Sequence, residues 1–482
     1  MSFEEIRQNR IKKLERIREN GFNPYPAKAE RTHKINEAIL NFEKLVQEKT
    51  EIILTGRIML IRTQGGASFA QIEDESGRFQ IFAKRDEIGE KDYIFLFTNL
   101  DIGDFLEARG SLFVTKKGEK TLLLKTYKIL AKTLLPLPEK WHGLKDIEER
   151  FRKRYLDLIM NEEAREIFKK RSKFIDAIRE FLKNNGFLEV ETPVLEDIPG
   201  GADAEPFITH HNYLDKNFYL RISLELHLKR LIVGGYENVF EIGKVFRNEG
   251  MDREHLQEFT EMECYAAYKD YNWLMDFCEK LYCQTIQKVF GSLKTGDLDF
   301  TPPWQKIDYF DIFKEKTGID LVKYNDKDSF VKEVKKLNLE GIDYKSGQGR
   351  IIDAVYKRFA RPYIKGPAFL IHQPAIISPL AKKKEDEPHK TERFQILING
   401  SEIGNGFSEL NDPIEQRTRF EDQTKFCAGR DKEAQMIDED FIAALEYGMP
   451  PTAGFGVGID RLFMAAAGIS SIRETVFFPM MK

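Results

Sequence analysis

The chain has 482 residues, of which 41% are hydrophobic, and its 75 basic and 79 acidic side chains give a formal net charge of −4. This hydrophobic content excludes a disordered chain, no apolar run approaches the ~18 residues of a membrane span, and the 4 cysteines exclude a disulfide framework. The first residues, MSFEEIRQNRIKK, lack the apolar segment of a secretory signal. We therefore expect a cytoplasmic protein that does not enter a membrane, with roughly two or three structural units.

Residues 1–50 are predicted to form an N-terminal helical extension, because apolar side chains recur at helical spacing from Ile6 to Ile17. The basic side chains between Arg7 and Arg18 fit either a solvated helix face or a weak phosphate-binding arm. From residue 51 the apolar period changes to two, which predicts short strands separated by turns. The expected strands are 51–61, 68–73, 78–83, 105–114 and 121–129, with a helical stretch near 85–100. Five such strands are typical of a small closed β-barrel that binds oligonucleotides, the OB-fold, which we assign to 51–135.

A linker is predicted over 136–160, where the sequence begins with Pro136-Leu137-Pro138. Apolar side chains at helical spacing then predict a long helix over 162–185. From there to the end, strands and helices alternate without the βαβ rhythm of a parallel sheet. We therefore expect a large α+β domain over 161–482, with an antiparallel sheet flanked by helices.

Three further blocks carry the most informative residues of the chain. They are GFLEVETPVL at 186–195, FRNEG followed by EFTEME at 246–263, and PTAGFGVGIDRLF at 451–463. Together and in this order they resemble motifs 1, 2 and 3 of the class II aminoacyl-tRNA synthetases. Within that class, the segments HGLKDIEERFRKRYLDLI at 142–159 and GNGFSELNDP at 404–413 resemble the bacterial type of lysyl-tRNA synthetase.

This resemblance implies the class II catalytic fold and a reaction in two steps. ATP would activate L-lysine to lysyl-adenylate with release of pyrophosphate, and the lysyl group would then pass to the 3′ end of tRNA(Lys). Mg²⁺ is implied as the metal that accompanies ATP, and a homodimer is implied by the first block. Two alternatives stay open: a class II ligase for aspartate or asparagine, and a catalytically inert synthetase-like protein that binds RNA.

The resemblance also implies roles for the residues around ATP. Arg247 would hold the α-phosphate and the substrate carboxylate, and Arg461 would face the adenine and the γ-phosphate. Glu402 would bind Mg²⁺, since hard cations prefer carboxylate oxygens. Several positions depart from the family pattern. Gln395 replaces a metal-binding carboxylate, and Glu254 replaces a phosphate-facing arginine; the others are Leu224, Leu256, Gln257 and Thr126. The other implied ATP contacts are Glu249, His255 and Phe259, of which Phe259 would stack on the adenine.

The implied lysine pocket is acidic. Residues 405, 407 and 409 fall on one face of a predicted strand, and their amide, aromatic ring and carboxylate suit a cationic ligand as well as a solvent-facing strand. Because a buried ammonium group is costly unless acidic groups meet it, the glutamates of the pocket favour lysine over aspartate. The residues that the resemblance assigns to the pocket are Gly201, Glu225, Glu263, Tyr265, Asn405, Phe407 and Glu409.

One face of the predicted barrel combines an aromatic with polar side chains. Strand alternation places Phe69 on the polar face of its strand, and it turns Gln80 outward on the next strand. A lone exposed aromatic is common, but on this kind of barrel face base stacking is the better-supported role. The resemblance implies that Phe69 stacks on an anticodon uridine, with Arg62 and Gln80 forming hydrogen bonds nearby.

Overall fold

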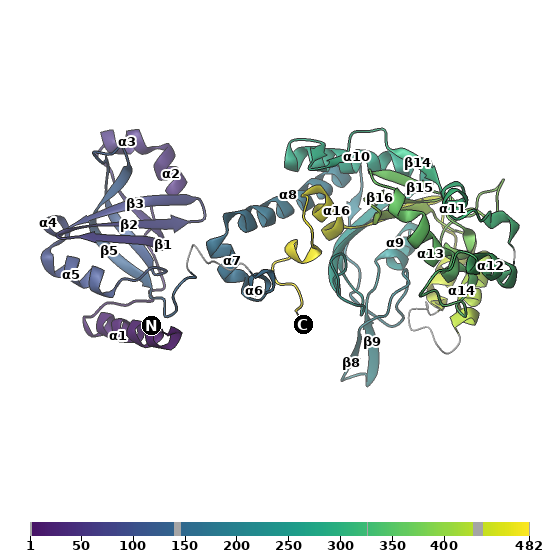
Figure 1. Ribbon diagram of the computed structural model, residues 1–482, viewed down its shortest axis with the longest axis horizontal. Helices are drawn as coiled ribbons and strands as arrows, with labels where there is room; N and C mark the ends of the chain where they lie inside the picture. The colour runs from purple at the N-terminus through teal and green to yellow at the C-terminus, as the bar shows by residue number, and fades with distance from the viewer. Residues whose placement is uncertain (1, 139–145, 325, 428–436, 482) are drawn as a thin grey trace. The chain divides into compact units, whose positions relative to one another are not determined.

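The computed structural model describes residues 2–138, 146–324, 326–427 and 437–481. Internal contacts divide the chain into two compact units, Met1–Lys145 and Asp146–Lys482, which we call the barrel unit and the sheet unit (Figure 1). Within the described ranges, no helix is both long enough and apolar enough to cross a lipid bilayer.

Five strands of the barrel unit close into a barrel in the order β1-β2-β3-β5-β4. Their alternating pattern buries apolar side chains such as Ile58, Ile72, Ile81, Leu106 and Leu122 in one core. The predicted five-stranded barrel is therefore confirmed. The strands are β1 (Glu51–Gln64), β2 (Ala67–Asp74), β3 (Gly77–Lys84), β4 (Phe105–Val114) and β5 (Lys120–Ala131). The helices are α1 (Phe3–Glu19), α2 (Ile35–Leu40), α3 (Phe42–Gln47), α4 (Arg85–Ile88) and α5 (Glu90–Asn99).

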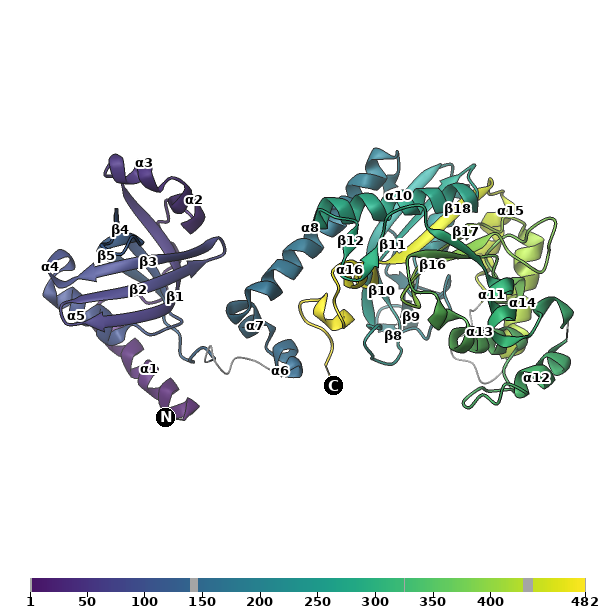
Figure 2. The ribbon, with the colours of Figure 1, turned by 45° about the horizontal axis from the view of Figure 1, so that its top comes forward.

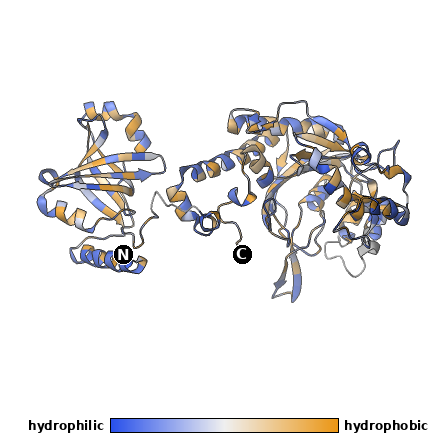
Figure 3. Cartoon of the chain, in the orientation of Figure 1, coloured by the Kyte–Doolittle hydropathy of each residue, from blue (hydrophilic) through white to orange (hydrophobic). Residues whose placement is uncertain are grey.

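Polar contacts fasten helix α1 to the barrel. Arg10, which is 7% exposed, donates from Nη1 to Thr133 Oγ1 at 2.6 Å and to the Leu135 carbonyl at 3.0 Å. Lys13 adds an ion pair with Asp101 at 2.7 Å. Figure 3 shows that most of α1 is hydrophilic, and Leu14 and Ile17 are its buried apolar side chains.

The sheet unit is built on an eight-stranded sheet in the order β14-β15-β16-β17-β18-β11-β10-β6. Its pairs are antiparallel except for the two outermost pairs, β14 with β15 and β10 with β6. The predicted α+β class is therefore confirmed. The strands are β6 (Leu188–Glu189), β10 (Asn238–Phe246), β11 (Glu258–Ala267), β14 (Gln305–Asp308), β15 (Ala368–Ile371), β16 (Arg393–Ile398), β17 (Ser401–Ser408) and β18 (Thr452–Gly458). Two smaller sheets contain β7 (Leu195–Glu196), β8 (Ile208–His211) and β9 (Lys216–Leu220), and β12 (Lys294–Thr295) with β13 (Leu298–Asp299).

Helices cover the large sheet unequally. The long helices α8 (Glu162–Asn184) and α10 (Tyr271–Phe290) pack with α16 (Ile459–Ala466) against one face, where Phe174, Phe394 and Phe455 form part of the main core (Figure 2). This apolar packing leaves the opposite face of the central strands for polar groups. The other helices are α6 (Ile147–Arg152), α7 (Arg154–Met160), α9 (Glu225–Val233), α11 (Tyr309–Thr317), α12 (Lys327–Lys335), α13 (Gln348–Phe359), α14 (Pro413–Cys427) and α15 (Glu439–Glu446).

The residues between the barrel and the sheet are partly helical. Helices α6 and α7 occupy much of the range 136–160 that we predicted as a linker, and they cluster with the sheet unit. Arg154 explains this attachment, since it is 2% exposed and donates from Nε to the Phe477 carbonyl at 3.0 Å. Residues 139–145 of the predicted linker lie outside the described residues, and the predicted domain boundaries stay predictions.

Candidate active site

The open face of the central strands collects the predicted pocket residues. On β11 the side chains of Met262 and Cys264 enter the apolar core, so the alternating residues Glu261, Glu263 and Tyr265 face the other way. The register pairs β11 with the glycines of β18: Glu263 lies opposite Gly456 and Tyr265 opposite Gly454. We call Gly454 and Gly456 the glycine floor. They have no side chains on this face of the sheet, and the acidic residues lie beside them.

Glu263 is held by three hydrogen bonds. Its Oε1 accepts from Ser223 Oγ at 2.9 Å and from the Leu224 N–H at 3.0 Å, and its Oε2 accepts from the Tyr265 hydroxyl at 2.7 Å. Burial, together with the neighbouring carboxylates of Glu261 and Glu225, raises the pKa of Glu263 to about 8. The carboxyl group is therefore held in one position by neutral donors, and no cation among the described residues forms an ion pair with it.

A buried cation joins two of the other predicted pocket residues. Lys229 Nζ lies 2.5 Å from Glu225 Oε1 and also forms an ion pair with Glu409 Oε2. Phe407 lines the same place, with its ring centre 5.4 Å from that ammonium nitrogen. Burial raises the pKa of Glu409 well above its ordinary value, and the negative charges of Glu225 and Glu263 raise it further. The ion pair with Lys229 lowers the pKa and only partly offsets these effects. Sequence reasoning missed Lys229 as a pocket residue.

Two glycines make room for this cluster. Gly201 has φ +84°, and a Cβ there would lie 2.8 Å from Ser223 Oγ and 3.1 Å from Glu225 Cβ. At Gly454 a Cβ would lie 2.1 Å from Glu409 Oε1. Gly201 was assigned to the pocket from the sequence, and Gly454 belongs to the block 451–463 that resembles motif 3.

Asn405 and Gln395 face the same side of the sheet from two adjacent strands. They are register partners of β16 and β17, and Asn405 Oδ1 accepts a hydrogen bond from Arg393 Nε at 2.9 Å. Arg393 was not singled out from the sequence, although its position two residues before Gln395 on a strand puts it on the same face.

The strand, loop and strand predicted over 246–263 are present as β10, the residues between them, and β11. Arg247 stands at the end of β10, with its guanidinium carbon 5.1 Å from the Phe259 ring centre and its Nη2 3.9 Å from Glu261 Oε1. Arg247 Nε also donates to the Ile222 carbonyl at 3.2 Å. Guanidinium, aromatic ring and carboxylate thus meet at the edge of the acidic pocket.

The two other predicted residues of this loop are less tightly placed. His255 is tied to the exposed Asp252, with Nδ1 2.8 Å from a carboxylate oxygen. Glu249 is exposed, and its backbone carbonyl accepts from Gln257 Nε2 at 3.2 Å. The structure therefore places both on the loop, but no described contact joins either side chain to Arg247.

Arg461 is fixed by backbone carbonyls at the start of α16. Its Nε donates to the Glu254 carbonyl at 2.9 Å and its Nη1 to the Glu402 carbonyl at 3.4 Å. The Glu254 carboxylate in turn accepts from Ser401 Oγ at 2.7 Å, directly beside Glu402 in the chain. The structure thus joins Arg461 to the backbone of Glu402 and of Glu254, the residue that departs from the family pattern.

A buried ion pair behind Arg461 connects three distant segments. Asp460 Oδ1 accepts from Arg171 Nη2 of α8 at 2.5 Å, and its Oδ2 accepts from the Thr260 N–H at 2.8 Å. Asp460 is 0% exposed and directly precedes Arg461, while Thr260 directly follows Phe259. We call the contacts of Asp460 with Arg171 and Thr260 the clamp; the clamp holds Arg461 and Phe259 at a fixed spacing.

The predicted RNA-facing residues of the barrel unit lie on neighbouring strands. Phe69 stacks on Phe82 with ring centres 4.5 Å apart, and Arg62 is its register partner on β1. Gln80 is on β3, where its Nε2 donates to Thr121 Oγ1 at 2.8 Å. Phe82 thus extends the aromatic surface that Phe69 offers on this face of the barrel.

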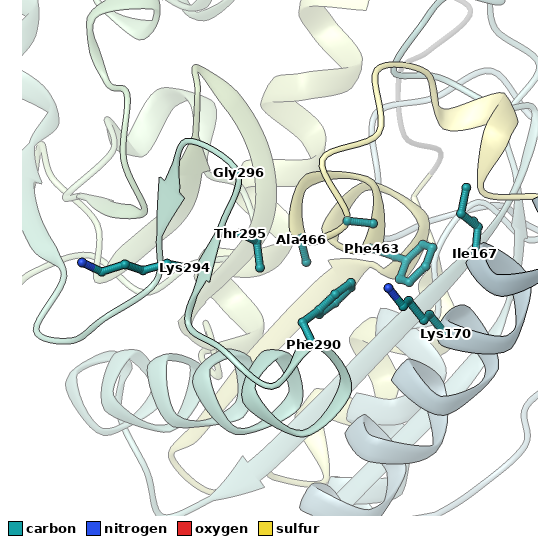
Figure 4. Close-up of a pocket in the computed structure, with 9 residues that line it drawn as sticks. Ile167, Lys170, Phe290, Lys294, Thr295, Gly296, Phe463 and Ala466 are labelled. Atoms are coloured by element: carbon teal, nitrogen blue, oxygen red, sulfur yellow. The ribbon is translucent and has the colours of Figure 1, made fainter. Parts of the chain in front are cut away.

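None of these residues lines a separate cavity of about 260 Å³ in the sheet unit. Its lining comes from α8, α10 and α16 and the β12–β13 hairpin, on the helix-covered face of the sheet (Figure 4). Apolar side chains such as Ile167, Phe290 and Phe463 make up much of its wall, with Lys170 and Lys294 beside them. It contains none of the acidic or aromatic residues of the candidate active site.

Two known families match the chain. The family described as tRNA synthetases class II (D, K and N) matches residues 146–482, and the OB-fold nucleic acid binding domain matches residues 52–130. The chain therefore belongs to the class II tRNA synthetases of this group.

Three relatives that match the chain over nearly its full length are lysine–tRNA ligases. The chain is 47% identical to a lysine–tRNA ligase of Dehalococcoides mccartyi, with 100% of this chain and 98% of the relative covered. It is 46% identical to a lysine–tRNA ligase of Roseiflexus sp., with 100% and 99% covered. It is 49% identical to that of Thermoanaerobacter pseudethanolicus, with 99% and 96% covered.

Proposed function

We propose that this chain is a lysine–tRNA ligase. The observation that carries the proposal is the charge of the pocket. Four carboxylates, those of Glu225, Glu261, Glu263 and Glu409, lie around the glycine floor, and among the described residues only Lys229 and Arg247 form ion pairs with them. Free lysine brings two ammonium groups and one carboxylate, which supplies the missing positive charge.

In the first step, a carboxylate oxygen of lysine attacks the α-phosphorus of ATP, and the bond to the bridging oxygen breaks to release pyrophosphate. The nucleophile is already ionised, so the protein need not remove a proton, and catalysis consists of positioning and charge stabilisation. We assign Arg247 to the substrate carboxylate and the α-phosphate, because a guanidinium can bind two oxygens at once.

The nucleotide site is completed by the residues around Arg247. Phe259 is assigned to stack on the adenine, and Arg461 to face the adenine and the γ-phosphate. Glu249 and His255 are assigned to the loop that closes over ATP. The support for this assignment is the cluster at the ends of β10 and β11, where Arg247 contacts Phe259, and Asp460 joins the N–H of Thr260.

Mg²⁺ would be held mainly by the phosphates, with Glu402 as its protein ligand. Glu402 fits this role, since carboxylate oxygens suit a hard cation and its backbone carbonyl accepts from Arg461, the residue assigned to the γ-phosphate. Within the described residues, no group of three or more His, Cys, Asp or Glu side chains could enclose a metal alone. When bound, the ion would neutralise phosphate charge during the displacement.

In the second step, a terminal hydroxyl of tRNA(Lys) attacks the lysyl carbonyl and AMP leaves. The barrel unit is proposed to read the anticodon, with a base stacked on Phe69 and hydrogen bonds from Arg62 and Gln80. Stacking on an aromatic side chain is worth roughly 1–3 kcal/mol per base. Phe82, which continues the Phe69 stack, supports this use of the surface.

A homodimer is also proposed. The block 186–195 leaves three apolar side chains exposed, Leu188 at 48%, Val194 at 40% and Leu195 at 48%. Clustered exposed apolar residues are typical of protein–protein contacts. A cytoplasmic location remains a proposal from the sequence.

The competing functions make different demands on the site. A ligase for aspartate would need an unpaired cation where the pocket offers carboxylates, and an inert protein would not need the Arg247 and Arg461 arrangement. Charging of unfractionated tRNA with radiolabelled amino acids tests the proposal. Lysyl-tRNA is expected, and aspartyl- or asparaginyl-tRNA in its place would refute the assignment.

A further inference from the structure

An ammonium group of the chain itself already lies in the pocket that we assign to lysine. Lys229 is 0% exposed on α9 and is engaged with one oxygen each of Glu225 and Glu409. The ring centres of Phe407 and Phe441 lie 5.4 Å and 5.8 Å from its Nζ. A buried lysine of this kind needs a reason, because removing an ammonium group from water is expensive.

The way in which Lys229 binds Glu409 leaves half of that carboxylate free. Both carboxylate oxygens are buried. Oε2 faces the Lys229 ammonium in an ion pair, whereas Oε1 has neither an ion pair nor a hydrogen-bond partner among the described residues. Oε1 points over Gly454, where a Cβ would come within 2.1 Å of it, and the Tyr265 ring borders the same spot. A buried carboxylate oxygen without a donor is an unfilled binding position.

Building on the proposed function, we propose that Lys229 is a positioning residue that determines lysine specificity. By holding Oε2 of Glu409 and one oxygen of Glu225, its ammonium group orients Oε1 of Glu409 toward the side-chain ammonium of the bound lysine. Lys229 does not touch the reacting atoms. It acts through Glu409, and it also supplies one of the positive charges that let several carboxylates share one pocket.

The charge balance around the pair gives the expected effect of removing Lys229. The titratable groups that face the pair are Glu225 from α9, Glu263 and Tyr265 from β11, and Glu409 after β17, while α15 contributes Phe441. Asp438, at the start of α15, is paired with Arg230 at 2.6 Å. Burial raises the pKa of Glu409 and Lys229 lowers it, so loss of the cation shifts ionisation of Glu409 to higher pH. A protonated Glu409 accepts an ammonium group less well.

The test is lysine-dependent ATP–pyrophosphate exchange by Lys229→Gln, Lys229→Met and Lys229→Arg between pH 6.5 and 9. At neutral pH the Gln and Met variants are expected to raise the lysine KM by about tenfold or more, as for the loss of a hydrogen bond to a charged group, with the ATP KM unchanged. Their deficit is expected to shrink as the pH rises toward 9, because a higher pH favours the ionised form of Glu409 while the lysine side chain, with a pKa of about 10.4, stays charged. Lys229→Arg keeps a cation and is expected to keep the wild-type pH dependence.

Lys132→Met in the barrel unit is the matched control. Lys132 has a side chain 0% exposed and pairs with Asp104 at 2.8 Å, so its loss is expected to lower the melting temperature without changing the lysine KM. Folded Lys229 variants with a wild-type lysine KM and pH profile would overturn the inference. If both neutral variants fail to fold, a Lys229→Arg protein whose lysine KM becomes more pH-dependent would overturn it instead. Absence of lysine-dependent exchange in the wild-type protein would overturn the proposed function itself.

Discussion

Replacing Glu263 by glutamine should make the protein more stable at alkaline pH. The pKa of Glu263 is raised from 4.5 to about 8 in the folded chain, chiefly by burial and then by Glu261 and Glu225. A carboxyl group with a raised pKa contributes its full stability below pH 4.5, and that contribution is lost as the pH rises toward 8, because only the unfolded chain releases its proton easily. Glu263→Gln removes this loss while keeping the shape of the protonated group.

The size of the effect follows from the same values. At about 1.4 kcal/mol for each pH unit, the interval from 4.5 to 8 sets an upper limit of about 5 kcal/mol. Neighbouring Glu261 and Glu409 take up part of the proton exchange, so we expect Glu263→Gln to gain about 1–3 kcal/mol over the wild type at pH 8 and almost nothing at pH 5.

Denaturant unfolding at pH 5 and pH 8, without ligand, measures both values. Glu241→Gln is the matched comparison, since Glu241 is the register partner of Glu263 but is paired with Arg221 at 2.7 Å. Breaking that buried pair should cost about 3–5 kcal/mol at both pH values. A Glu263→Gln protein that loses stability at pH 8 would refute the charge account of the pocket.

Three further outcomes are expected. Phe69→Ala should weaken tRNA binding by roughly 1–3 kcal/mol in a filter-binding assay and leave lysyl-adenylate formation intact; an equal loss in both would contradict a separate role for the barrel. Gln395→Glu should lower the Mg²⁺ midpoint of ATP–pyrophosphate exchange, because it adds a carboxylate near Glu402, and an unchanged midpoint in a folded protein would remove residue 395 from the metal site. Arg171→Met should raise the ATP KM by about tenfold, because it removes a charged hydrogen bond to Asp460 worth about 1.5–3 kcal/mol that positions Arg461 and Phe259. The lysine KM should stay the same. Equal changes in both KM values would mean that the Arg171–Asp460 pair has only a structural role.

Much of the fold follows from local sequence patterns. The period of two gave the five barrel strands, and the helical period predicted 162–185 where α8 spans Glu162–Asn184. Gly186, at φ +81°, ends that helix region in a conformation that favours glycine. Alternation also placed 405, 407 and 409 on one face, and all three lie at the pocket.

The residues that sequence reasoning missed depend on contacts between distant segments. Lys229 follows Glu225 by four residues, a spacing that on its own describes a surface ion pair, and its burial comes from Phe407, Glu409 and Phe441. The Arg171 to Asp460 pair likewise joins residues 289 apart in the chain. No local period encodes such pairs, because packing of whole elements creates them.

ATP–pyrophosphate exchange with a panel of single amino acids tests the central claim, that the acidic pocket selects lysine. The purified wild-type protein, ATP, Mg²⁺ and labelled pyrophosphate are sufficient, so no tRNA is needed. The charge deficit around Glu225, Glu261, Glu263 and Glu409 predicts exchange that depends on lysine and is weak or absent with aspartate and asparagine. Robust exchange with aspartate but not with lysine would contradict the account.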